Sequence, residues 1–314
     1  MRMAFIVDPL DVLEPYKDSS IAMMRAAQAA GHSVYAILQT SLHWTTQHGV
    51  CAQATPLTLR ETHTDWYEES QGAIEPLRAF DAIIMRKDPP FDMEYVTSTW
   101  LLERAEVEGA RVFNSARALR DHSEKFAIAE FAQFTVPTLV ARDATRLGEF
   151  IGEQRDVILK PLDGMGGIQV FRVREDDPNR RVIIETLTHD GQRTIMAQRF
   201  IPEIVKGDKR ILLVGNEVVP YCLARIPMAG ETRGNLAAGG RGEAQPLSER
   251  DREIAETLAP ILAGRGMIFV GIDVIGDWLT EINVTSPTCM VEIRQQTGFD
   301  AAALFIRKVE EACR

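Results

Sequence analysis

Cysteine is scarce in this sequence, and the four cysteines are not arranged to hold a metal or a disulfide framework. Cys51, Cys222, Cys289 and Cys313 are scattered over 314 residues without a C-x-x-C pair. Small secreted domains depend on closely spaced disulfides, whereas proteins of the cytosol keep their thiols reduced. We therefore expect free thiols and a cytoplasmic location.

Long hydrophobic runs are absent as well. The first apolar run, Ala4–Val7, is stopped by Asp8, and no window of about 18 residues is both apolar and uncharged. The sequence therefore predicts neither an export signal nor a membrane span. With 45% hydrophobic and 25% charged residues, the chain has the composition of a globular protein with two or three packed units.

An excess of positive charge is also missing. The 35 lysines and arginines are outnumbered by 45 aspartates and glutamates, which gives a net charge of −10. We expect no nucleic-acid partner, and any phosphate site must be a local basic pocket. Neither G-x-G-x-x-G after the first strand nor G-x-x-x-x-G-K-[ST] occurs. These absences argue against a dinucleotide-binding fold and against a Walker-type phosphate loop.

The first third of the chain alternates short apolar runs with amphipathic segments. This pattern is typical of a doubly wound α/β unit with a parallel sheet. We expect strands at 3–7, 34–38, 81–85 and 111–114, helices at 21–30 and 93–108, and loops with short strands over 41–80. Arg86 directly follows the third strand, at the sheet edge where ligands bind, and its planar fork suits a substrate carboxylate. An internal salt bridge to Asp88 or Asp92 would explain Arg86 equally well.

A glycine-rich turn follows a buried strand in the middle of the chain. The run VILKPLDGMGGI (157–168) carries Lys160 to the end of the strand and then places Gly164, Gly166 and Gly167 in a turn. Glycines let backbone N–H groups approach and hold an anion. The same turn could be an ordinary hairpin, but Lys160 and a second lysine, Lys125, favour a phosphate site. Helices are expected at 123–134, 144–154 and 182–187, and strands at 138–140 and 195–201.

Two further segments complete the predicted site. Residues 198–201 would form a wall for an adenine ring, and the glycine-rich run 228–242 contains Arg233 and Arg241 as its only basic groups. Long glycine-rich loops inside compact domains are often functional, and the two arginines favour a lid over a negatively charged intermediate. A hairpin precedes the run at 211–214 and 218–224, and helices are expected at 249–262 and 301–312.

The stretch 268–290 carries the central prediction. Two apolar runs flank Gly276-Asp277, which indicates a hairpin, and Asp273, Glu281 and Asn283 interrupt the buried pattern. Carboxylate and amide oxygens suit Mg²⁺, which shares its coordination shell with phosphates and water. A strict two-residue turn would pair Asp273 with Thr280 and put Glu281 and Asn283 on the other face. We therefore predict an odd-length loop or a β-bulge; otherwise Asp273 leaves the metal shell.

Several of these runs together resemble a known family, the bacterial glutathione synthetases. The resemblance covers nearly the whole chain and rests on MRKDPPFD (85–92), LKPLDGMGG (159–167), GDKR (207–210), PYCLARIP (220–227), GETRGNLAAGGRG (230–242) and LTEINVTSPT (279–288). It implies an α/β ATP-grasp fold in three parts: a substrate domain at 1–121, a lid domain at 122–201 and a metal and nucleotide domain at 202–314. It also implies the ATP-dependent ligation of γ-glutamylcysteine and glycine through an acyl phosphate.

The resemblance further implies roles for particular residues. Arg210 and Arg225, with the lid arginines Arg233 and Arg241, would stabilise the transferring phosphoryl group. Asp273, Glu281 and Asn283 would bind two Mg²⁺ ions, for which Mn²⁺ can substitute, and Arg86, Asn283 and Ser286 would contact substrate. The nucleotide would be held by Lys125, Lys160, Gly164, Gly166, Gly167, Gln198, Arg199, Phe200, Ile201 and Asp208.

The resemblance also implies a homotetramer. Two alternatives to glutathione synthesis stay open: a ligase that joins a different acid and amine, and a nucleotide-binding protein without turnover.

Overall fold

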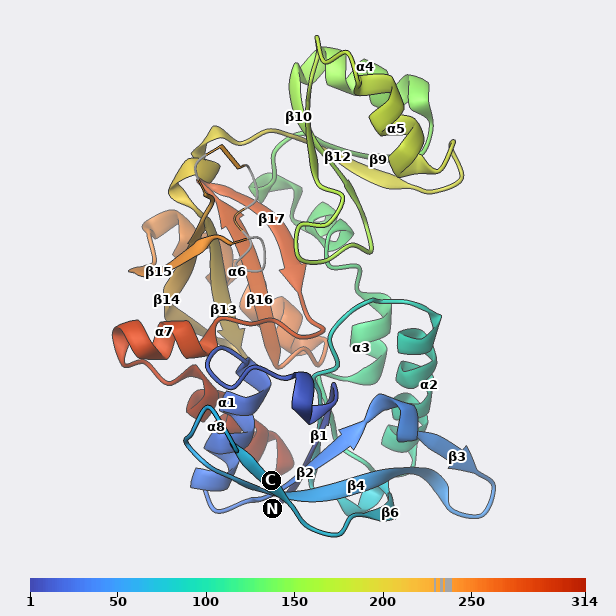
Figure 1. Ribbon diagram of the computed structural model, residues 1–314, viewed down its shortest axis with the longest axis vertical. Coiled ribbons are helices and arrows are strands. Elements are labelled where there is room, and N and C mark those ends of the chain that lie inside the picture. The colour runs from blue at the N-terminus through green and yellow to red at the C-terminus, as the bar shows by residue number, and fades with distance from the viewer. Residues whose placement is uncertain (229, 232–233, 235–238) are drawn as a thin grey trace.

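Three β-sheets form the framework of the molecule, and each has its own helices (Figure 1). The computed structural model describes residues 1–228, 230–231, 234 and 239–314. The first sheet has eight strands, the second four and the third five. None of the helices in these ranges is both long enough and apolar enough to cross a bilayer. The four cysteines are free thiols, as expected.

The first sheet has a parallel core, as the sequence predicted. Its backbone order is β3-β4-β2-β1-β7-β8, and β1 pairs in parallel with both β2 and β7. The strands of the parallel core are β1 (Arg2–Val7), β2 (Ser33–Leu38), β7 (Ala82–Met85) and β8 (Val112–Phe113). The helices are α1 (Ser19–Ala29), α2 (Met93–Val107) and α3 (Ala116–Asp121), with short 3-10 turns at Leu10–Val12, Gln39–Ser41 and Leu77–Ala79. Asp18 caps α1 by accepting hydrogen bonds from the backbone N–H groups of Ser20 and Ile21.

The expectation of loops with short strands over residues 41–80 holds for β3, β5 and β6 but was wrong for one long strand. The eleven-residue strand β4 (Gly49–Leu59) lies antiparallel to β2 and also pairs with β3 (His43–Thr45), β5 (Tyr67–Glu69) and β6 (Ala73–Pro76). Pro56 and the polar residues in β4 obscure its pattern in the sequence, because the strand is buried by tertiary contacts and not by a regular alternation.

The second sheet is antiparallel and has the order β11-β10-β12-β9. Its elements are β9 (Thr138–Ala141), α4 (Ala144–Gln154), β10 (Asp156–Pro161), β11 (Phe171–Arg174), α5 (Arg180–Thr188) and β12 (Ile195–Arg199). A small core of its own lies between this sheet and its two helices. The segment that leads into the sheet, predicted as an α-helix, is instead a 3-10 helix over Phe126–Phe134 that is kinked at Phe131.

The third sheet is also antiparallel and carries the predicted hairpins. Its order is β15-β14-β13-β16-β17, with β13 (Asp208–Val214), β14 (Glu217–Ile226), β15 (Arg241–Pro246), β16 (Phe269–Ile275) and β17 (Trp278–Asn283). A 3-10 turn, Pro202–Lys206, precedes it, and its helices are α6 (Glu249–Gly264), α7 (Met290–Thr297) and α8 (Ala301–Cys313).

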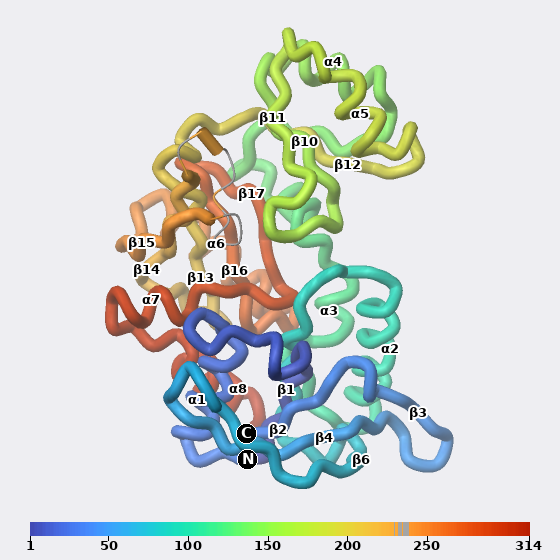
Figure 2. Tube along the Cα trace, viewed as in Figure 1, coloured from blue at the N-terminus to red at the C-terminus, as the bar shows by residue number. Residues whose placement is uncertain are grey.

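The C-terminal helix α8 packs against elements from the N-terminal part of the chain. In Figure 2 the red C-terminal helix α8 lies beside the blue α1, and both termini lie in the same region. Apolar residues of β1, such as Phe5, belong to the same core as Phe305 of α8 and Leu212 of β13. The first and third sheets are therefore built around shared cores, whereas the second sheet stands apart from them in the figure.

Candidate active site

A β-bulge in the β16–β17 hairpin sets the geometry of the site. Ile275 pairs with Trp278 and Val274 with Leu279, but Asp273 pairs with Glu281, so the register shifts by one residue at Thr280. The predicted bulge is thereby confirmed. Because directly paired residues share a face, Asp273 and Glu281 project from the same side of the sheet. Asn283, opposite Gly271, lies on that face as well.

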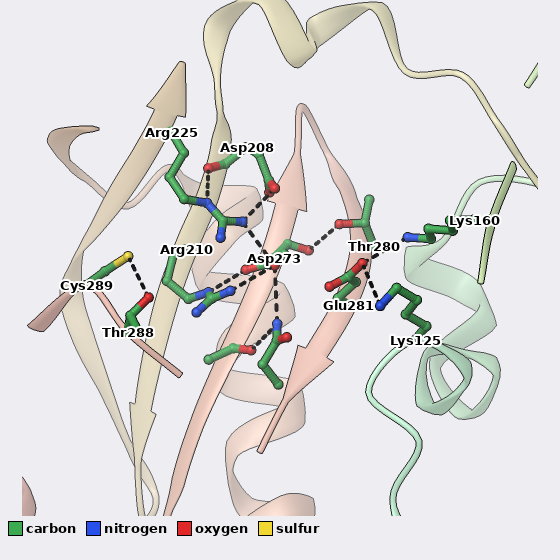
Figure 3. A network of polar contacts seen from close by, with 12 residues as sticks. Lys125, Lys160, Asp208, Arg210, Arg225, Asp273, Thr280, Glu281, Thr288 and Cys289 are labelled. Atoms are coloured by element: carbon green, nitrogen blue, oxygen red, sulfur yellow. Dashed lines mark hydrogen bonds and ion pairs between the residues drawn. The ribbon is translucent and has the colours of Figure 1, made fainter. Parts of the chain in front are cut away.

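Asp273 lies at the centre of a buried charge network (Figure 3). Arg210 donates two hydrogen bonds to Asp273, from Nε to Oδ1 at 2.5 Å and from a terminal nitrogen to Oδ2 at 3.1 Å. Arg225 lies 3.0 Å from Oδ2 of Asp273 and donates to Oδ2 of Asp208 at 2.5 Å. Although burial disfavours the charged form, the two guanidinium groups hold the pKa of Asp273 well below its usual range.

Asp208 behaves differently although it touches the same arginine. Burial raises the pKa of Asp208 to about 7. The negative charges of Asp273 and Glu281 also raise it, whereas the positive charge of Arg225 lowers it. Its second oxygen, Oδ1, is buried without a hydrogen-bond partner among the described residues. A buried polar atom of this kind is suited to receive a donor from a ligand.

Glu281 brings together the two predicted phosphate-binding lysines. Its Oε1 lies 3.2 Å from Nζ of Lys160 and 3.8 Å from Nζ of Lys125, and the lysine side chains are both buried (Figure 3). Burial disfavours the charged carboxylate, but the two ammonium groups outweigh it and lower the pKa of Glu281. Lys125 also donates to the carbonyl oxygen of Gly164, which joins this cluster to the glycine-rich turn.

Two cavities meet at this cluster. The lysine cavity, of about 880 Å³, lies between the second and third sheets. The arginine cavity, of about 860 Å³, is lined by Arg210 and Arg225. The residues that line both are Lys125, Gly164, Met165, Gly166, Asp273 and Glu281. A group bound at this junction would therefore contact ligands in both cavities.

The predicted adenine wall lines the lysine cavity. Gln198, Arg199, Phe200 and Ile201 all contribute to the lining, together with Asp208 and Gly167. The backbone N–H groups of Arg199 and Phe200 already donate to Pro137 and Asp156 carbonyl oxygens. Recognition of a base edge by these two N–H groups would therefore require those hydrogen bonds to open.

The predicted substrate residues are placed differently from one another. Asn283 and Ser286 line the arginine cavity. Arg86 is buried and is not part of the lining of either cavity. It donates to Ser20 Oγ at 3.0 Å and to the Pro287 carbonyl oxygen at 2.9 Å, and one terminal nitrogen has no partner among the described residues. Arg86 thus forms a salt bridge with neither Asp88 nor Asp92. Its hydrogen bond to the Pro287 carbonyl oxygen holds the 286–288 segment in place.

Only part of the predicted lid lies within the described residues. Arg241 begins β15, is exposed, and pairs with Glu243 at 2.8 Å. Arg233 lies outside the described residues.

Sequence reasoning missed two residues that shape the site. Oε1 of Glu124 accepts hydrogen bonds from the N–H groups of Val284 and Thr285 and from the Thr285 hydroxyl, at 2.8 to 3.0 Å. Glu124 thereby ties the Lys125 segment to the end of β17. Gly271 sits opposite Asn283, where a side chain would collide with Arg210. A glycine inside a buried strand is a usable signal of such close approach.

Solved structures with the same architecture define the class of protein. A D-cycloserine synthetase, DcsG, superposes with a TM-score of 0.69 over 100% of both chains at 16% identity. The ATP-grasp ligase PsnB, complexed with its minimal precursor, superposes with a TM-score of 0.65 over 99% of both chains, also at 16% identity. The fold is therefore that of the ATP-grasp ligases.

Sequence comparison identifies the family within this class. The N-terminal domain of prokaryotic glutathione synthetase matches residues 1–120, and its ATP-grasp domain matches residues 124–298. A glutathione synthetase of Ralstonia nicotianae is 61% identical over 99% of this chain and 96% of its own length. One of Bordetella parapertussis is 59% identical over 99% of both. The chain belongs to the prokaryotic glutathione synthetases. It carries out the ATP-dependent ligation of glutathione synthesis, which requires ATP and a divalent metal ion.

Proposed function

We propose that this chain joins γ-glutamylcysteine to glycine through an acyl phosphate, releasing ADP and phosphate. The meeting of the lysine and arginine cavities at Asp273 and Glu281 carries the proposal, because phosphoryl transfer needs the nucleotide and the acceptor carboxylate at one junction. The two cavities give the nucleotide and the acid substrate separate places on either side of that junction.

In the lysine cavity we assign ATP. The adenine lies against residues 198–201, and Lys125, Lys160 and the Gly164–Gly167 turn hold the phosphates. The Lys160 and Lys125 ammonium groups already surround one carboxylate, so they can neutralise phosphate charge without reorganising. Asp208, whose Oδ1 has no partner among the described residues, is placed to accept a hydrogen bond from the nucleotide.

The metal assignment rests on the donor set. Asp273, Glu281 and Asn283 place hard oxygen donors on one face of the hairpin. Both Asp273 oxygens accept hydrogen bonds from Arg210, Arg225 or Asn283, so a metal at Asp273 would require some of these bonds to open. Within the described ranges no three acidic, histidine or cysteine side chains form a complete metal cage. Mg²⁺ usually takes one or two carboxylates and completes its shell with phosphates and water, so the set fits two Mg²⁺ ions, with Mn²⁺ as a substitute. When bound, the ions would neutralise charge on the transferring phosphoryl group.

The chain's own residues then act on the substrates. Arg210 and Arg225, held in place by Asp273, direct their guanidinium groups toward the arginine cavity and stabilise charge on the phosphoryl group. Phosphorylation converts the cysteinyl carboxylate into an acyl phosphate, with ADP as the leaving group. The glycine amine attacks the acyl carbon, and phosphate departs. Residues 228–242, with Arg233 and Arg241, would exclude water from this hydrolysable intermediate.

ADP release tests the proposal. Purified protein is given Mg²⁺, ATP, γ-glutamylcysteine and glycine, and each component is omitted in turn. We expect ADP and glutathione only from the complete mixture. Turnover only with a different acid or amine would support a ligase activity but would contradict the proposed substrates. ATP binding without turnover with any pair would favour the non-catalytic alternative.

Glu281→Gln tests the metal assignment separately. The change removes one charged oxygen donor, and we expect apparent Mg²⁺ affinity to fall on the order of 10- to 100-fold. Activity is titrated against Mg²⁺ at saturating ATP. The matched control is Glu217→Gln, which alters an exposed carboxylate of the same sheet that pairs with Lys308 and lines neither cavity. A normal Mg²⁺ dependence in Glu281→Gln would contradict the assignment.

The remaining proposals concern the whole chain. We infer the three-part division at 1–121, 122–201 and 202–314 and a homotetramer from the resemblance to the family, and a cytoplasmic location from the scattered cysteines. Analytical ultracentrifugation at micromolar concentration checks the assembly, and a monomer would overturn it.

A further inference from the structure

Four carboxylates line the arginine cavity, and three of them have strong partners within the protein. Glu124 accepts three hydrogen bonds from the 284–285 segment. Asp273 is held by Arg210 and Arg225, and Glu281 by the two lysines. The fourth is Asp88, from the loop that follows β7.

The Asp88 side chain forms no ion pair within 4 Å among the described residues, although it lies within the electrostatic influence of the buried Arg86. The neighbouring lysine, Lys87, instead pairs with Asp8 at 2.9 Å and donates to the backbone oxygen of Asp88. The Asp88 N–H donates to Asp8 as well, so the loop backbone is fixed while the carboxylate faces the cavity. Burial raises the pKa of Asp88, and a hydrogen bond from Ser286 and the positive charge of Arg86 only partly oppose this shift. A ligand that brings a positive charge would relieve this cost.

The position of Asp88 along the cavity limits which charge this can be. Asp88 contacts Ser286, which lies five positions after Glu281. Five residues span at most about 16 Å in an extended strand. In γ-glutamylcysteine, the α-amino nitrogen lies about 9 Å from the reacting cysteinyl carboxyl carbon when the chain is extended, as bond lengths require. The two distances are compatible with a substrate that lies between the phosphoryl junction and Asp88.

We propose that Asp88 binds the α-ammonium group of the γ-glutamyl end of the acid substrate and selects for it; this inference rests on the proposed function. The reacting carboxylate must lie beside Arg210 and Arg225, where the phosphoryl group arrives. The ammonium end then points away from that junction, toward the loop of the first sheet. Glycine, in contrast, must place its amine at the acyl carbon, beside the phosphoryl junction.

The test compares two substrates in two proteins. N-glutaryl-cysteine has the same chain as γ-glutamylcysteine but lacks the α-ammonium group. We expect the unmodified enzyme to prefer γ-glutamylcysteine by about 10- to 100-fold in kcat/KM, the usual value of a charged hydrogen bond. In Asp88→Asn the ratio of kcat/KM for γ-glutamylcysteine to kcat/KM for N-glutaryl-cysteine should fall close to one. The loss should appear mainly as a higher KM for γ-glutamylcysteine, with the KM for ATP unchanged.

Asp92→Asn is the matched control. It removes the same charge from the same loop, but Asp92 is exposed and caps α2, and asparagine can keep that cap. We expect the control to retain the full substrate preference. An unchanged preference in Asp88→Asn would overturn the inference, and so would an equal loss of kcat for both substrates, which would indicate a general base. Failure of the unmodified enzyme to use γ-glutamylcysteine would remove the proposed substrates and this inference together.

Discussion

Gly271 leaves the space in which Arg210 reaches Asp273. A Cβ atom at this position would lie 2.8 Å from Cδ of Arg210 and 2.8 Å from Cβ of Pro287. Both neighbours are held in place, Arg210 by Asp273 and Pro287 through its carbonyl oxygen by Arg86. A methyl group here must therefore displace the guanidinium group or the 286–288 segment.

Gly271→Ala should lower kcat at least 10-fold while the protein stays folded. Overpacking in a dense region typically costs about 1 to 3 kcal/mol of unfolding free energy, which a protein of this size tolerates. Steady-state kinetics and urea unfolding measure the two effects. Gly148→Ala is the control, because no atom lies within 4 Å of the added Cβ and the site is helical. Normal kcat in Gly271→Ala would show that Arg210 does not need its present position.

His122 gives the protein a pH-sensitive position beside the hairpin. Its Nε2 lies 2.9 Å from the carbonyl oxygen of Ile282, and burial lowers the pKa of His122. The unfolded chain takes up a proton near pH 6.5, whereas the folded state resists it. As pH falls below about 6.5, the unfolded state therefore binds more protons and stability decreases.

His122→Gln should flatten this decrease. Glutamine can donate to the Ile282 carbonyl oxygen but does not titrate, so the difference in stability between pH 7.5 and pH 5.5 should be smaller than in the unmodified protein. Urea unfolding midpoints at both pH values give the comparison. Parallel pH curves for the two proteins would mean that His122 is protonated equally in the folded and unfolded states.

Among the secondary-structure elements, the β16–β17 hairpin was the most predictable and the most informative. Asp273, Glu281 and Asn283 interrupt an otherwise apolar hairpin, and placing all three on one face requires a loop of odd length or a bulge. The irregularity itself could therefore be inferred from sequence. Its location at Thr280, in place of a longer loop, could not be inferred, because both solutions satisfy the same face requirement.

Other elements were predicted less well for identifiable reasons. β4 is long because four other strands, β2, β3, β5 and β6, pair with it, and the local residue pattern of β4 does not show these pairings. The helix α7 begins after Cys289, which has a positive φ of 89° and gives no capping signal in the sequence. The position of Arg86 after its strand predicted the correct edge of the sheet. It did not predict the hydrogen bond to Pro287, which is 201 positions away in the sequence. Local patterns thus indicated residues that the structure brings together around two cavities, whereas the contacts between them depend on tertiary packing.

The element that begins at Arg241 provides a test of the lid. Arg241→Ala should lower kcat roughly 10-fold without lowering stability, because the exposed Arg241–Glu243 pair contributes little to folding. Arg233→Ala should have a similar effect. The lid hypothesis predicts, in addition, more ATP hydrolysis without glutathione formation, as water reaches the acyl phosphate. Equal yields of ADP and glutathione at normal kcat in both variants would contradict the lid hypothesis.

For the whole molecule, the distribution of cores matters more than the order of elements along the chain. Residues of the first and third sheets share two apolar cores, and α8 closes one of them. The second sheet has a core of its own, although Met196 of β12 packs into a core of the other two sheets. Its own core is formed by Leu147, Ile151, Val157, Leu159, Val173, Ile184, Leu187, Ile195 and Ala197. Local patterns along the chain indicate three consecutive units, but only the structure reveals that the first and last are packed as one body.

This arrangement predicts two cooperative units in hydrogen exchange. Phe305→Ala should lower stability by about 3 to 5 kcal/mol and reduce amide protection in β1 and β13 together, because Phe305 packs with both ends of the chain. Leu159→Ala should cost about 2 to 5 kcal/mol but reduce protection only in the second sheet, β9 to β12, and its helices. Since Lys160 follows Leu159 directly, the second variant should also bind ATP more weakly. If Leu159→Ala reduced protection equally in β1 and β13, the second sheet would not be a separate unit, and any movement of it over the nucleotide would have to be coupled to the rest of the molecule.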